Sequence, residues 1–214
     1  KTLRTKGFIM SIVTLNNRGV RSVSAFGSLN TGSMVFIKKL TASSSGTLSF
    51  VNGASSVVLD STYKAYLFTF KDIHPATDNT HFSFQADTGT NTNYNQTMTT
   101  TWFYALQQES GGTPELTYAA GTDQAQGTAF QTLAANVGNG NDESCSGSLR
   151  IFNPSSTTFV KHYISRVSCY QKDNFSMDDF SAGYFNTTSA ITTLQFKMSS
   201  GNIDAGDICL YGIN

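Results

Sequence analysis

The chain has 214 residues, equal numbers of acidic and basic side chains at 14 each, and only 13% charged residues. This length suffices for one substantial hydrophobic core. The low charge disfavours nucleic-acid binding, which needs a clustered positive surface to release counterions from phosphates. The absence of any run of 18 apolar residues predicts no insertion into a membrane.

The charges are segregated along the chain. No Asp or Glu occurs in the first 59 residues, which carry seven basic side chains; the remainder carries all fourteen acids and seven bases, so the net charges are +7 and 7 − 14 = −7. This asymmetry predicts a basic arm joined to an acidic body. Such an arm is suited to lie along an acidic neighbour, for example the body of another copy. The alternative is that these charges are simply solvated.

Residues 1–40 are predicted to form the extended arm. Their apolar side chains are spread among Asn, Gly, Ser and Arg without sustained helical periodicity, so they need a partner surface for burial. The run Met34 to Leu40 is either a link into the body or its first strand. The residues that we expect to bind the partner are Ile12, Val13, Leu15, Arg18, Val20, Arg21, Val23 and Phe26.

Residues 41–214 are predicted to form an all-β body. Many Thr and aromatic residues favour strands, and turn residues separate the alternating segments. This pattern predicts an antiparallel β-sandwich resembling a jelly roll. The exception is 123–143, where either a short helix near 125–135 or a long surface loop is expected. The predicted strands are 47–51, 56–60, 63–73, 82–85, 97–107, 149–152, 159–170, 182–185, 192–198 and 208–213.

Motifs for catalysis are missing from the sequence. The three histidines lie outside HExxH and HxH patterns, and neither GxSxG nor a phosphate-binding glycine loop occurs. We therefore predict no enzyme, no cofactor and no metal site. The loop 139–143 combines Asp, Asn and Gly, but turn stabilisation explains these residues more simply than calcium does. The cysteines, expected to be small apolar residues in or beside strands, are Cys145, Cys169 and Cys209.

Two further groups of side chains merit attention. The adjacent acids Asp178 and Asp179 suggest paired carboxylates, which glycoside hydrolysis requires across one cleft. Trp102 and Tyr104 are candidates for stacking on a glycan. The alternative for these aromatic residues is packing in the core of the sandwich, which sequence favours.

Six stretches of the chain resemble virion structural proteins of tailed bacteriophages, especially those of cyanophage-like and pelagiphage-like marine viruses. They are Ile12–Val23, Leu40–Ser45, Ile73–Ala76, Phe84–Asn95, Phe152–His162 and Met198–Gly206.

The resemblance implies a noncatalytic tail-fibre, tail-tip or head-decoration subunit. Such a protein is made in the host cytoplasm and sits on the outer surface of the phage particle. Its expected partners are other virion proteins, which it meets through the arm, and copies of itself. Closed symmetry is the norm for such homo-oligomers, and we favour a trimer. The alternative is a carbohydrate-binding module of a phage fibre that recognises a host surface glycan. A glycan-cleaving enzyme is the weakest possibility.

Overall fold

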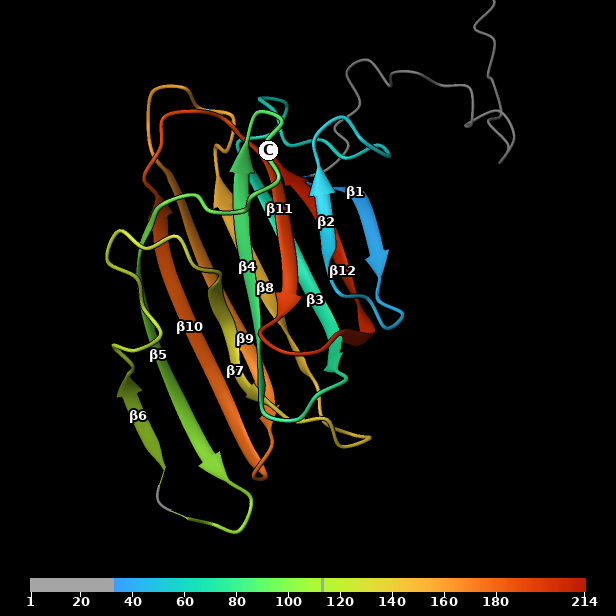
Figure 1. The fold of residues 1–214 in the computed structure, drawn as a ribbon, viewed down its shortest axis with the longest axis vertical. Coiled ribbons are helices and arrows are strands. Elements are labelled where there is room, and N and C mark those ends of the chain that lie inside the picture. Colours follow the sequence, from blue (N-terminus) through green and yellow to red (C-terminus); the bar gives the residue numbers. More distant parts are fainter. Residues whose placement is uncertain (1–32, 113) are drawn as a thin grey trace, which may run out of the picture. The chain divides into compact units, whose positions relative to one another are not determined.

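The computed structural model describes residues 33–112 and 114–214 (Figure 1). These residues form twelve strands and no helix. The predicted all-β class is therefore confirmed. The strands are β1 (Met34–Thr41), β2 (Leu48–Val51), β3 (Ala65–Pro75), β4 (Thr80–Thr88), β5 (Met98–Gln108), β6 (Glu115–Tyr118), β7 (Gln131–Val137), β8 (Cys145–Phe152), β9 (Lys161–Gln171), β10 (Phe175–Phe185), β11 (Ile191–Met198) and β12 (Ile203–Ile213).

All strand pairs are antiparallel, and together they form a nearly closed, barrel-like sheet. One series of neighbours runs β1-β12-β3-β8-β9-β10-β5-β6, and a second runs β7-β4-β11-β2. The two series meet where β7 pairs with β9 through a single residue pair, Val137 with Gln171. The sheet thus consists of a long series of eight strands and a short series of four (Figure 1).

The core lies between the two series and is rich in Phe. Phe196 on β11 is fully buried, and its ring contacts five other Phe rings with centroid separations of 5.4–6.3 Å. These contacts join the short series to β3 of the long series, because the partners come from β2, β3 and β4. They are Phe50, Phe68, Phe70, Phe82 and Phe84.

The structure differs from the sequence prediction in several segments. The helix considered near 125–135 is wrong, since residues 131–137 form strand β7. The segment 56–60 is not a strand, although Leu59 is buried and donates its N–H to the side chain of Asn52. Strand β6 and most of β10 were not predicted.

The N-terminal part of the prediction has two outcomes. Met34–Thr41 pairs with β12 as strand β1, so residues 34–40 are the first strand of the body rather than a link to it. The expected partner-binding residues between Ile12 and Phe26 lie outside the described residues.

Candidate interaction surfaces

Strands β5, β9 and β10 present a partly apolar face on the side of the sheet opposite the core. On β9, exposed residues alternate with buried ones from Lys161 to Cys169, as a strand with one solvated face requires. Ile164 is 57% exposed and Phe103 is 38% exposed. We call this surface the outer face, defined by Phe103, His162, Ile164, Arg166, Phe180 and Tyr184.

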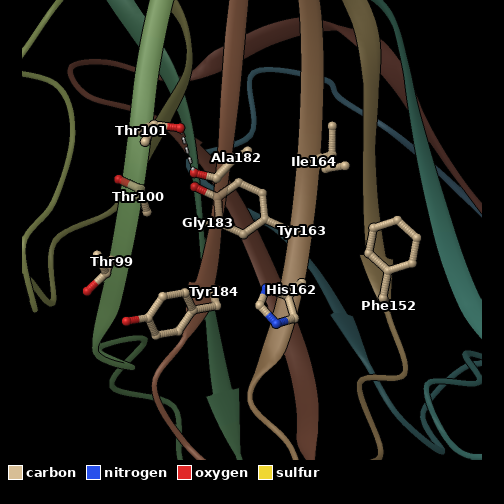
Figure 2. A pocket seen from close by; sticks show the side chains of 10 residues that line it. All are labelled: Thr99, Thr100, Thr101, Phe152, His162, Tyr163, Ile164, Ala182, Gly183 and Tyr184. Atoms are coloured by element: carbon tan, nitrogen blue, oxygen red, sulfur yellow. Dashed lines mark hydrogen bonds between the residues drawn. The ribbon is translucent and has the colours of Figure 1, made fainter.

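One end of the outer face is hollowed (Figure 2). The hollow has a volume of about 510 Å³ and is lined mainly by apolar atoms. The small side chain of Ala182 lies between Ile164 and Thr101 in the strand register, which leaves space above it. The rings of His162 and Tyr184 lie side by side below, with centroids 5.8 Å apart. This lining suits an apolar side chain of a partner.

The middle of the outer face is an aromatic stack held by an ion pair. The rings of Phe103 and Phe180 are parallel, with centroids 4.7 Å apart. The guanidinium of Arg166 lies 5.0 Å from the centroid of Phe180 and donates to both carboxylate oxygens of Asp178, at 2.6–3.1 Å. Because the pair is exposed, it adds little stability, but its bidentate geometry fixes the side chain over the ring.

Asp178 and Asp179 point to opposite faces of β10, as successive residues of a strand do. The Asp178 side chain is on the outer face, whereas Asp179 is 0% exposed. Asp179 Oδ2 accepts the N–H of Ala135 at 3.2 Å. Burial raises the pKa of Asp179 to about 8. The two carboxylates therefore cannot face one cleft as the paired acids of a glycosidase would.

The opposite, inner side of β5 and β10 borders a second hollow of about 320 Å³, which we call the inner cleft. His81 Nδ1 accepts the N–H of Asn136 at 3.1 Å, and burial lowers the pKa of His81, so its ring is neutral with the proton on Nε2. The side chains that line the inner cleft include His81, Trp102, Tyr104, Leu106, Asn136 and Met177.

The two aromatic residues suggested for glycan contact belong to the inner cleft. Their rings come together, with centroids 5.5 Å apart. Trp102 is only 1% exposed, so it packs in the interior, which was the alternative expected for it. Tyr104 is half-buried, and its hydroxyl donates to the Glu115 carboxylate at 3.0 Å. Burial, followed by the neighbouring Glu115, raises the pKa of Tyr104.

The remaining residues singled out in the sequence have structural contacts. His74 Nδ1 lies 2.6 Å from the backbone oxygen of Glu143, which is hydrogen-bond distance. The Glu143 carboxylate accepts the N–H of Gly140, which stabilises the turn within 139–143. Among the described residues, no three His, Cys, Asp or Glu side chains are grouped as metal ligands would be.

The cysteines lie in strands, as expected. Cys145 and Cys169 are buried register partners on β8 and β9, and burial raises the pKa of both thiols. Cys209 on β12 is half-buried.

In the part of the chain that the structure describes, no helix is long and apolar enough to span a bilayer. Comparisons with protein-family models, with curated proteins and with solved structures found no match.

Proposed function

We propose that the chain is a noncatalytic structural subunit of a virus particle. The observation that carries this proposal is the strand order. With β5, β6, β9 and β10 set aside, eight strands remain, arranged as β1-β12-β3-β8 and β2-β11-β4-β7. Numbered in chain order, these are 1-8-3-6 and 2-7-4-5, the order that two Greek keys produce in a jelly-roll sandwich. Jelly rolls are typical of viral capsid proteins, and also of lectins.

The four strands set aside all extend the same side of this arrangement. β5 and β6 are inserted between β4 and β7, and β9 and β10 between β8 and β11, yet they pair in one row beyond β8. The outer face lies on this added row. Its exposed apolar side chains and its hollow are typical of a protein–protein contact. We propose that the outer face joins copies of the subunit, with a trimer favoured.

The source and the mode of attachment rest on the sequence resemblance. The chain resembles virion proteins of tailed bacteriophages, which supports a tail-fibre, tail-tip or head-decoration subunit. The arm then attaches the subunit to other virion proteins on the outer surface of the particle. A role in glycan recognition is less well supported, because Trp102 faces the interior and the outer hollow offers few polar groups.

The test is self-association of the full chain, measured by sedimentation velocity over a concentration series. We expect one discrete oligomer that Ile164→Asp dissociates, because a charge in an apolar contact is costly. The matched control is Val51→Asp, since Val51 is 42% exposed on β2 of the short series. A wild type that stays monomeric, or equal assembly of both variants, would refute the proposed contact.

A further inference from the structure

Two buried polar atoms beside the inner cleft have no hydrogen-bond partner among the described residues. They are Nε1 of Trp102 and Oδ1 of Asp179. In the register of β5 and β10, Asp179 lies opposite Tyr104, and the neighbouring pairs on the same side are Met177 with Leu106 and Ser181 with Trp102. Asp179 is thus flanked by residues that line the cleft, although its own fully buried side chain is not part of the lining. Leaving an acceptor such as Asp179 Oδ1 unpaired costs free energy, so its presence indicates a missing donor.

Among the residues that the structure describes, no cation lies in the surroundings of Asp179. The groups that interact with its charge are the Ala135 N–H on β7, Tyr104 on β5, the two buried thiols of Cys145 and Cys169, and Asp178 on its own strand. His81, from β4, is neutral, and no Lys or Arg is among the residues that line the cleft. A buried carboxylate without a cation is held in its neutral form.

The walls of the inner cleft suit a basic side chain. Trp102 and Tyr104 supply aromatic rings, which attract cations, and the Glu115 carboxylate is bonded to the Tyr104 hydroxyl. A Lys or Arg inserted here would give Asp179 the opposite charge that it lacks. The cleft volume of about 320 Å³ is at the lower end for a binding pocket and matches one long side chain better than a large ligand.

The chain itself contains a segment of matching charge. Residues 1–32 carry five basic side chains and no acid, whereas residues 33–214 carry nine basic and fourteen acidic ones, a net charge of 9 − 14 = −5. Thirty-two residues span up to about 100 Å when extended, which is enough to reach a neighbouring subunit.

We propose that the inner cleft receives a Lys or Arg side chain from residues 1–32 of a neighbouring copy, with Asp179 as its ion-pair partner. This inference rests on the proposed function as an assembling subunit, and it assigns the basic segment a specific receptor. Binding would ionise Asp179 and release its proton below pH 8, so affinity should rise with pH up to that value.

The test uses Trp102 as a built-in probe, because it is the only Trp in the chain and residues 1–32 contain neither Trp nor Tyr. The host is the full chain with its five basic residues before Ser33 replaced by Gln, and the probe is a synthetic peptide of residues 1–32. We expect a saturable change in Trp102 fluorescence. Affinity should fall at least tenfold with a peptide carrying the same five Gln replacements.

Two host variants separate the inner cleft from the rest of the surface. Asp179→Asn keeps an acceptor for the Ala135 N–H but cannot ionise; we expect at least tenfold weaker binding and no pH dependence between pH 6 and pH 8. Asp178→Asn, on the outer face, should bind the peptide like the parent host. Circular dichroism of each host establishes that the fold is retained.

Each contrary result has a distinct meaning. Equal affinity of the Asp179→Asn and Asp178→Asn hosts would overturn the cleft as receptor, even if the wild-type chain still oligomerises. Absence of any fluorescence change would do the same. A monomeric wild type whose Trp102 emission already differs from that of the Gln-substituted host would show that the segment occupies its own cleft, which overturns binding between copies. A monomeric wild type without that difference would count against the proposed function as well.

Discussion

The buried carboxylate of Asp179 should make the protein less stable as the pH rises. Its pKa is about 8 in the native state, against an ordinary value of 3.8. Between these values the native state retains a proton that the unfolded chain has released, so the contribution of Asp179 to stability is largest below about pH 4 and falls until about pH 8. The free energy of unfolding falls by about 1.4 kcal/mol per pH unit, or on the order of 5 kcal/mol between the two pKa values. That is comparable to the whole stability of many domains.

Replacing Asp179 with Asn removes this dependence while keeping a similar shape. We expect Asp179→Asn to be more stable than the wild type at pH 8.5 by a few kcal/mol, and to differ little from it at pH 4.5. The measurement is urea unfolding at several pH values. Each variant and its parent are made in the full chain with its five basic residues before Ser33 replaced by Gln, because a bound basic side chain would ionise Asp179. Asp178→Asn is the control, since that carboxylate is partly exposed and paired with Arg166. Parallel stability curves for the wild type and Asp179→Asn would refute the assignment of a raised pKa to this residue.

Three further predictions concern packing and burial. Phe196→Ala should cost about 3–5 kcal/mol of unfolding free energy, because Phe196 is fully buried among five rings, whereas Phe159→Ala should be nearly neutral because Phe159 is 70% exposed. Gly183→Ala should lower the free energy of unfolding by about 1–3 kcal/mol, since a Cβ would lie 2.6 Å from a backbone oxygen of β5. Gly121→Ala should lower it by less than about 1 kcal/mol, because there is open space around Gly121. The midpoints of urea unfolding compare the two variants. A thiol reagent should modify Cys209 first in the native protein, because Cys145 and Cys169 are buried and Cys209 is only half-buried. All three cysteines should react equally only after unfolding, and mass spectrometry can follow the modification.

The sequence could predict strands wherever one face is apolar and the other polar. β9 is such a case, because its buried and exposed residues alternate from Lys161 to Cys169. β10 was missed because its buried positions include Asp179 and Ser181, which reverse the expected pattern. β7 was missed because the stretch 123–143 shows little of the alternation that marks a strand, so a short helix or a loop was expected there. In the structure Gln131 is buried and accepts a hydrogen bond from Thr100, which only the pairing of distant segments provides.

The candidate surfaces could not be predicted for a related reason. The outer face depends on β5 pairing with β10, which places Phe103 opposite Phe180, although the two are far apart in the sequence. Trp102 and Tyr104 were identified from their residue types, but the side to which they point depends on which face of β5 meets the core. The period of two would have separated Asp178 from Asp179 immediately if β10 had been recognised as a strand.

The unequal lengths of the two strand series explain why both surfaces arise in one region. Eight strands of the long series face only four of the short series, which ends at β7. Beyond β7, the inner side of β5 and β10 lacks a complete covering sheet. The segment after β6 covers part of it: the Ala119 N–H binds the Trp102 carbonyl, and the Thr100 N–H binds the Gln124 carbonyl. The cleft is the space that this segment leaves.

A sheet extension built only for rigidity would fill that space with apolar side chains. The buried acid found beside it instead, with one oxygen unpaired, is more readily explained by a basic partner that arrives during assembly.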